Sequence, residues 1–187
     1  MVQKGKILGK PTLVFLTIGT TQFQFNRLLH AVDNALVKLD RNYKLIAQVG
    51  NSSYRWSYKK LKIFNYLSPS NIITCLRNAD YIFTHGGTNT LHLIVKHSDH
   101  LPFVVARIKK FNEHVSDHQE KYLEFIKNKI PTSIHKYISD SDKTNKGVFD
   151  YLQIKPKANT LKEYLYKNTQ KNKIIVGLTE YLDKLEN

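Results

Sequence analysis

The sequence of 187 residues is poor in the residues that build disulfide and metal scaffolds, since it has one cysteine, Cys75, one methionine and one tryptophan. A single cysteine excludes a disulfide framework and a cysteine-based zinc ribbon, and it favours a reducing compartment. Glycine and proline are also scarce, at 8 and 5 residues, while hydrophobic residues make up 41% of the chain. This composition excludes a disordered chain and suits one globular domain with a proper core.

Long apolar runs are absent as well. None approaches the roughly 20 residues that a membrane-spanning helix needs. The longest, Leu13–Ile18, follows lysines at positions 4, 6 and 10 and so imitates a signal peptide, but it is too short and polar residues 20–22 follow at once. The sequence therefore predicts a cytosolic globular protein.

Acidic residues are outnumbered, with 15 Asp and Glu against 29 Lys and Arg and a formal net charge of +14 at pH 7. Such an excess suits an anionic partner: nucleic acid, an acidic membrane or a phosphorylated ligand. One local basic cluster comprises Arg55, Lys59, Lys60 and Lys62. Most other lysines are scattered and no RNA-binding motif is present, so we favour a solvated lysine-rich surface as the explanation of the charge. We expect no nucleic-acid partner.

Apolar segments rich in β-branched residues alternate with segments of helical periodicity. Strands are predicted near residues 12–18, 44–49, 62–66, 80–84 and 102–106. Helices are predicted near residues 25–39, 68–77, 91–96 and 114–127. The alternation predicts an α/β fold, a Rossmann-like parallel sheet with helices on both faces.

The last third of the chain gives a weaker signal. Residues 139–147 resemble a polar loop, and residues 161–185 hold one or two amphipathic helices. We predict a Rossmann-like domain over residues 1–130 and a C-terminal helical extension, residues 131–187, packed on the same domain.

The loop at residues 85–90, His-Gly-Gly-Thr-Asn-Thr, is the strongest candidate for a binding site. Ligands of open α/β sheets bind at the carboxyl ends of the strands, where glycine-bearing loops fall at residues 19–22, 50–53 and 85–90. In the third loop two glycines allow close backbone approach, and the amides of a helix start favour a diphosphate. An ordinary tight strand-to-helix turn explains the same pattern, and both interpretations remain open.

A second polar cluster, residues 112–119, reads Asn-Glu-His-Val-Ser-Asp-His-Gln. On a helix, His114 and His118 share a face, as zinc ligands do, but a metalloprotease needs a Glu directly after the first His and no third ligand is evident. Residues 117–119 alternatively suit hydrogen bonds to sugar hydroxyls, and Asn112 or Ser116 could cap the helix. We expect no metal, while ligand contact and capping both remain open.

Five segments together resemble the C-terminal, donor-binding half of GT-B glycosyltransferases of the family 28 type. In order, they are Phe15–Phe23, Ala47–Asn51, Phe64–Ser70, Ala79–Thr88 and Glu113–Gln119. The chain is more closely similar to stand-alone versions of that half. These are the soluble subunits of two-component bacterial exopolysaccharide and capsule glycosyltransferases and of the eukaryotic dolichol-linked GlcNAc transferase. The resemblance implies a single GT-B C-terminal half, in which residues 1–130 form the nucleotide-sugar-binding domain.

The resemblance also implies a UDP-sugar donor and an inverting transfer without a metal or other cofactor. The residues that would hold the diphosphate are Gly86, Gly87, Thr88, Asn89 and Thr90. Those that would contact the nucleoside are Leu67, Ser68 and His92. Those that would contact the donor sugar are His114, Asp117, His118 and Gln119. Those that would face the cleft shared with the acceptor half are Gly19, Thr20, Thr21, Asn51 and Arg107.

A partner follows from the same resemblance. A membrane-anchored subunit would bind the lipid-linked acceptor, supply the general base and hold this chain at the inner face of the membrane, for surface-polysaccharide synthesis. The alternative is a non-catalytic donor-binding or assembly subunit. The family often carries a ribose-binding Glu on the helix after the glycine loop. Leu93 stands at that position, and its neighbour His92 is the candidate replacement.

Overall fold

The computed structural model describes residues 10–128, 137–139 and 143–154. The strands are β1 (Thr12–Thr17), β2 (Tyr43–Gln48), β3 (Leu61–Phe64), β4 (Tyr81–His85), β5 (Phe103–Val105) and β6 (Ile138–Ser139). The helices are α1 (Asn26–Leu39), α2 (Pro69–Asn78), α3 (Thr88–His97), the 3₁₀ turn η1 (Lys109–Phe111), α4 (His118–Lys127) and α6 (Thr144–Gln153). All five predicted strands are confirmed, with bounds that differ by a few residues.

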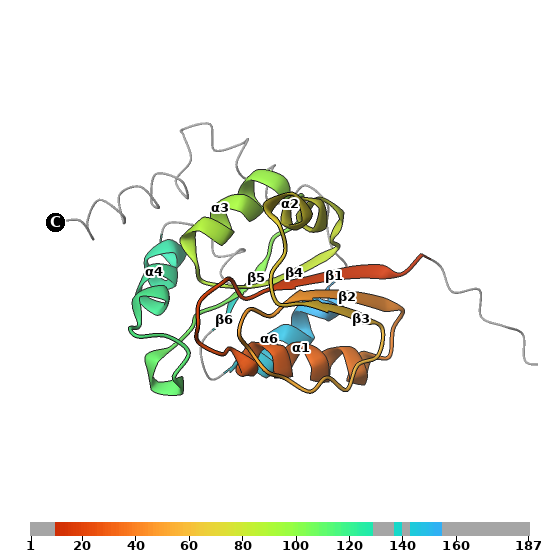
Figure 1. The fold of residues 1–187 in the computed structure, drawn as a ribbon, viewed down its shortest axis with the longest axis horizontal. Coiled ribbons are helices and arrows are strands. Elements are labelled where there is room, and N and C mark those ends of the chain that lie inside the picture. Colours follow the sequence, from red (N-terminus) through yellow and green to blue (C-terminus); the bar gives the residue numbers. More distant parts are fainter. Residues whose placement is uncertain (1–9, 129–136, 140–142, 155–187) are drawn as a thin grey trace, which may run out of the picture.

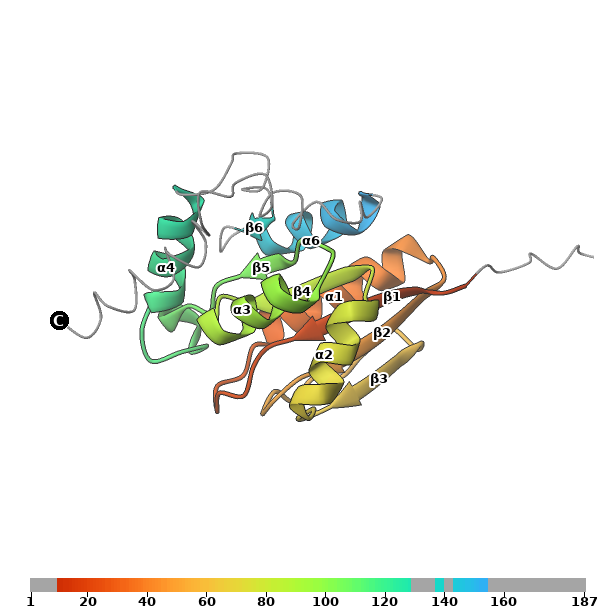
Figure 2. The ribbon, with the colours of Figure 1, turned by 90° about the horizontal axis from the view of Figure 1, so that it is seen from above.

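The strands form one parallel six-stranded sheet in the order β3-β2-β1-β4-β5-β6. Helices α1 and α6 cover one face, and α2 and α3 cover the other (Figures 1 and 2). This arrangement confirms the predicted α/β class. After β1 the chain builds the sheet outward through β2 and β3, and it then returns to place β4 on the other side of β1. The connection that leaves β1 therefore runs to one side of the sheet and the connection that leaves β4 runs to the other, which opens a crevice at the carboxyl ends of these two strands.

The core has two parts, one on each face of the sheet. Val14 and Leu16 of β1 pack with α1, whereas Phe15 between them packs on the opposite face with α3 and α4. All three side chains are fully buried. A strand buried on both faces explains why its sequence is continuously apolar rather than alternating.

The connection from β2 to β3 is held against α1 by a buried carboxylate. Asp33 accepts hydrogen bonds from the backbone amides of Ser57 and Tyr58 at 2.9 and 2.8 Å and from the Tyr54 hydroxyl at 3.1 Å. These bonds satisfy a charge that burial would otherwise penalise. They also fix the course of the chain into β3, the edge strand.

The predicted polar loop at residues 139–147 is only partly correct, because α6 begins at Thr144. The polar residues of its first turn obscure the helical pattern in the sequence. The buried residues of this helix nevertheless recur at helical spacing: Thr144, Val148, Tyr151 and Leu152. The Tyr151 hydroxyl donates to the Leu101 carbonyl at 2.6 Å, and burial raises the pKa of this phenol. Packing on α1 thus stabilises a helix that composition alone does not indicate.

Part of the segment assigned to a helical extension therefore contributes β6 and α6 to the same unit. The helices predicted at 161–185 lie outside the described residues. Within the described ranges, no helix has the length and apolarity required to cross a bilayer.

Candidate functional site

A cleft of about 570 Å³ lies at the carboxyl ends of β1 and β4. It is lined by Thr17, Gly19, Thr20, Thr21, Gln48, Ile72, His85, Gly86, Gly87, Thr88, Asn89, Thr90, Leu93, His114, His118 and Gln119. The structure thus brings together the loops after β1 and β4 and the segment that leads into α4, whereas no residue of the loop at 50–53 lines the cleft. Among these lining residues there is no Asp, Glu, Lys or Arg, so the wall is built of neutral polar groups, backbone and a few apolar side chains.

The first turn of α3 forms one side of the cleft. Gly87 precedes the helix with φ −75° and ψ 125°, and no side chain caps this end. Residues 88–90, which make the turn, all line the cleft. The unpaired amides of a helix start, together with the helix dipole, favour an anion at this point.

His85, the last residue of β4, lies beneath the two glycine loops. Gly19 has φ +75°, and a Cβ there would come within 2.7 Å of the His85 ring. A Cβ on Gly87 would overlap His85 Nε2. The imidazole therefore requires glycine at both positions, and the positive φ of Gly19 favours glycine there as well.

The His85 imidazole is neutral at physiological pH. Burial, and next the charge of Arg107, lower its pKa from 6.5 to about 3, and the Thr17 carbonyl opposes this only in part. Its Nδ1 has no hydrogen-bond partner among the described residues. A neutral imidazole on the cleft floor can donate to or accept from a ligand.

Arg107, directly after β5, is buried and ties two loops of the cleft together. Its guanidinium donates to the carbonyl oxygens of Phe23 and Gln24 at 3.0 and 3.2 Å, and it lies 4.7 Å from the centroid of the Phe25 ring. It also donates to the carbonyls of Ile18 at 2.8 Å and of Glu113 at 3.1 Å. Burial lowers the pKa of Arg107 to about 10, so it remains charged at pH 7.

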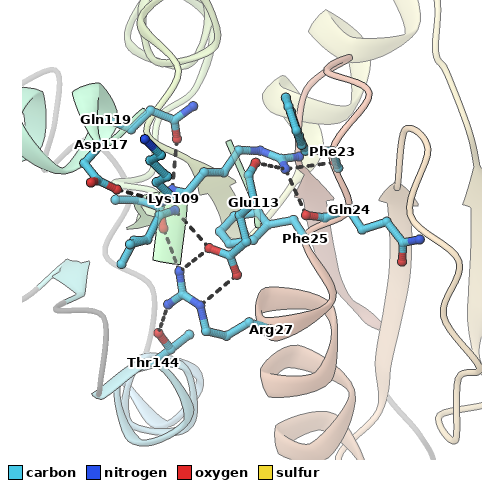
Figure 3. Close-up of polar contacts among 12 residues, drawn as sticks. Phe23, Gln24, Phe25, Arg27, Lys109, Glu113, Asp117, Gln119 and Thr144 are labelled. Atoms are coloured by element: carbon cyan, nitrogen blue, oxygen red, sulfur yellow. Dashed lines mark hydrogen bonds and ion pairs between the residues drawn. The ribbon is translucent and has the colours of Figure 1, made fainter. Parts of the chain in front are cut away.

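A partly buried ion pair between Arg27 and Glu113 braces the same region (Figure 3). The Glu113 carboxylate accepts from Arg27 Nε and Nη2 at 2.9 and 2.8 Å and from the Ile108 amide at 3.1 Å. Arg27 also donates to Thr144 Oγ1 at 2.8 Å and to the Ala106 carbonyl at 2.7 Å. These contacts link α1, the segment after β5 and α6.

The helix predicted from residue 114 begins only at His118. Neither Asn112 nor Ser116 caps it. The residue before the helix is Asp117, whose carboxylate accepts from the Lys109 amide at 2.7 Å and makes no cap bond. This bond and the left-handed Asn112, with φ 54°, hold residues 112–117 as a loop. The predicted shared helical face of His114 and His118 is therefore wrong.

The two histidines nevertheless meet at the cleft, with ring centroids 4.4 Å apart. Burial lowers the pKa of both, and their mutual proximity lowers that of His114 further. Ser116 Oγ lies 2.9 Å from His118 Nδ1. Among the described residues, no group of three or more His, Cys, Asp or Glu side chains could hold a metal ion.

No protein-family model matches the sequence, and a search of curated protein sequences finds no match. Solved structures do match. The chain is similar to the glycotransferase of kitacinnamycin, with TM-score 0.51 and 12% identity over 100% of this chain and 46% of that one. It is similar to CalG4, the calicheamicin glycosyltransferase, with TM-score 0.51 and 11% identity over 99% of this chain and 43% of that one. Its fold is one Rossmann-like half of a GT-B glycosyltransferase. The chain spans less than half the length of these relatives.

Some predicted site residues of this GT-B half do not line the cleft. The Leu67 amide donates to Gln48 Oε1 at 2.9 Å, and Ser68 Oγ caps α2 by accepting from the Asn71 amide at 3.3 Å. Asn51 is exposed and accepts from the Tyr66 hydroxyl at 2.6 Å. The others outside the lining are His92, Asp117 and Arg107.

Sequence reasoning did not assign Thr17, Gln48 or Ile72 to the site, and it included His85 in the candidate loop without giving it a role. Thr17, Gln48 and His85 are the last residues of β1, β2 and β4, so their position at strand ends was the available signal. His92 is exposed on α3, whereas its neighbour Leu93 lines the cleft. A rotation of about 100° per residue along a helix explains the difference.

Proposed function

We propose that this chain binds a UDP-sugar donor in the cleft and acts as the donor subunit of an inverting glycosyltransferase of the family 28 type. The observation that carries the proposal is the uncapped start of α3, which meets the neutral His85 at the point where the sheet order reverses. A diphosphate needs donors without a competing carboxylate, and no Asp or Glu lines the cleft. The resemblance of the fold to glycosyltransferases supports the same assignment.

Sugar transfer leaves negative charge on the departing diphosphate. The first-turn amides of α3 and the imidazole of His85 stabilise that charge as the glycosidic bond breaks, because they are already oriented when the charge develops. His114, His118 and Gln119 lie across the cleft and offer hydrogen-bonding groups to the sugar hydroxyls. This subunit thus holds the leaving group and orients the donor.

The acceptor side of the reaction lies on a partner in this proposal. In the stand-alone subunits that the chain resembles, the acceptor site lies on a separate protein, and no carboxylate lines this cleft to serve as a general base. A membrane-anchored subunit supplies both the base and the site for a lipid-linked acceptor of surface-polysaccharide synthesis. It keeps this chain peripheral at the inner membrane face, and it provides the proximity from which much of the rate arises.

A non-catalytic donor-binding or assembly subunit is the second candidate. The apolar Leu93 in the cleft wall favours it, since a loosely held donor would suit a supporting role. Turnover separates the two candidates: release of UDP from a UDP-sugar in membranes containing the partner requires the catalytic one.

Calorimetric titration of the full chain with UDP tests donor binding, and Asn89→Asp is the informative variant. Asn89 is exposed on the first turn of α3 and lines the cleft. An isosteric carboxylate there suits the helix dipole, so the fold is retained, but it repels a diphosphate. At a few ångströms the repulsion is about 1–4 kcal/mol, so UDP affinity falls by about fivefold or more.

Asn145→Asp is the matched control. Asn145 is likewise the second residue of a helix, α6, that begins Thr-Asn, and it is exposed and outside the cleft. The same substitution there leaves UDP affinity unchanged. Saturable UDP binding that is equally strong in both variants would contradict the placement of the diphosphate, and absence of saturable binding to the unmodified chain would overturn donor binding itself.

A further inference from the structure

The cleft has an apolar wall on the side of α2 and α3. Ile72 of α2 and Leu93 of α3 line it, and both side chains pack against the core on the same face of the sheet. Leu93 follows the first residue of α3 by five positions, or about 7.5 Å along the helix axis. A nucleoside whose diphosphate sits at the helix start therefore reaches this wall.

Two polar side chains of the cleft lining, those of Gln48 and Thr17, are already engaged with each other. Gln48 Oε1 accepts from the Leu67 amide at 2.9 Å, and Gln48 Nε2 donates to Thr17 Oγ1 at 3.2 Å. Gln48 is 2% exposed, so new partners would require these bonds to break. No Asp or Glu of the described residues lines the cleft to accept from a pair of sugar hydroxyls.

Recognition of ribose depends on such acceptors. A site that is built to hydrogen-bond a hydroxyl rejects the analogue without it by about 10⁴-fold, because its own polar groups are left unpaired. An apolar wall leaves no group unpaired when the hydroxyl is missing. Such a wall recognises the flat, apolar surface of a base and is indifferent to the sugar hydroxyls.

We infer that this cleft does not discriminate ribonucleotides from 2′-deoxyribonucleotides, so that its donors include sugars activated by either class of nucleoside diphosphate. The inference rests on the proposed donor-binding function and names its substrate class. Leu93 determines this tolerance, and the neighbouring His92 does not, because His92 is exposed and lies outside the cleft lining.

Competition calorimetry with UDP and 2′-deoxy-UDP on the full chain tests the inference. We expect the two dissociation constants to agree within about threefold, which corresponds to the loss of less than one net hydrogen bond. In Leu93→Glu and in the uncharged Leu93→Gln, a new acceptor faces the ribose. UDP is then preferred by about tenfold or more in each variant, and the Gln form separates hydrogen bonding from charge.

His92→Glu is the matched control, because it adds the same charge one residue away on the exposed side of α3. Its ratio of affinities stays that of the unmodified chain. If UDP binds but its 2′-deoxy analogue binds more than tenfold more weakly to the unmodified chain, the inference is overturned while donor binding stands. If neither nucleotide binds saturably, donor binding fails and the inference fails with it. Folded Leu93 variants with an unchanged ratio would also overturn the role of this wall.

Discussion

Substitution of Arg107 tests whether the cleft depends on a buried cation that never touches its ligand. The guanidinium donates to four carbonyl oxygens, those of Ile18, Phe23, Gln24 and Glu113. The first three belong to the loop after β1, and the fourth belongs to the loop before α4. Arg107→Met keeps the volume and removes every donor, so both loops lose their connection.

The expected loss of stability follows from two opposing contributions. Hydrogen bonds from a charged donor contribute about 1.5 kcal/mol each, or about 6 kcal/mol for four. Burial of the charge offsets part of this, because it lowers the pKa of Arg107 from 12.5 to about 10, which corresponds to about 3 kcal/mol. Arg107→Met should therefore destabilise the protein by about 3 kcal/mol. Arg107→Lys should lose about 2 kcal/mol, since an ammonium cannot span both loops.

Urea unfolding at pH 7 measures the change, with Arg55→Met as the control. Arg55 is exposed, and its substitution should alter stability by less than about 0.5 kcal/mol. Amide hydrogen exchange should accelerate in residues 18–24 and 113–119 of Arg107→Met and remain unchanged in the control. A loss below about 1 kcal/mol, or unaltered exchange in both loops, would refute the role that we assign to this side chain.

Two further predictions concern the histidine beneath the glycine loops. Because the pKa of His85 is about 3 when folded and near 6.5 when unfolded, only the unfolded state gains this proton as pH falls from 6.5 towards 3. The contribution of His85 to the free energy of unfolding is thus complete above pH 6.5 and declines by about 1.4 kcal/mol per pH unit below it. Urea unfolding at pH 7 and pH 5 should therefore show a smaller loss of stability in His85→Gln than in the unmodified chain. Gly19→Ala should lower the free energy of unfolding by about 1–3 kcal/mol in the same assay, because φ is positive there and the new Cβ would lie 2.7 Å from the His85 ring. Gly86→Ala should cost less, because its closest contact would be 3.2 Å. An equal decline in the first case, or a reversed order in the second, would contradict the geometry.

The parts of the fold that the sequence predicted are those encoded locally. The run at residues 12–18 is continuously apolar because β1 is buried on both faces, and such runs are visible without any partner. β6 has two residues, too few for a period to show. α6 was read as a loop over its first turn because Asn145 and Lys146 are polar, whereas the helix is stabilised by Val148 and Tyr151, which pack on distant segments.

The candidate site divides in the same way. Gly19 and Gly87 line the cleft, and the sequence analysis singled out both because they lie in loops that follow predicted strands. His85 was not assigned a role, because only the folded chain shows that both glycines make room for its ring. Arg107 was assigned to the cleft by resemblance, yet its guanidinium turns inward to backbone carbonyls, which no local pattern encodes.

The charge of the protein and the charge of its cleft differ for a physical reason. The chain carries a net +14, yet no Lys or Arg lines the cleft, and the guanidinium of the buried Arg107 donates to four carbonyl oxygens. A lysine on the wall would bind any anion, whereas fixed amides at the start of α3 would bind one whose oxygens match their geometry. Burial, and next the charge of Arg107, keep His85 neutral, and Arg107 also holds both loops. In the proposed function, the net positive charge of the chain would raise the local concentration of anions, and the neutral cleft would select among them.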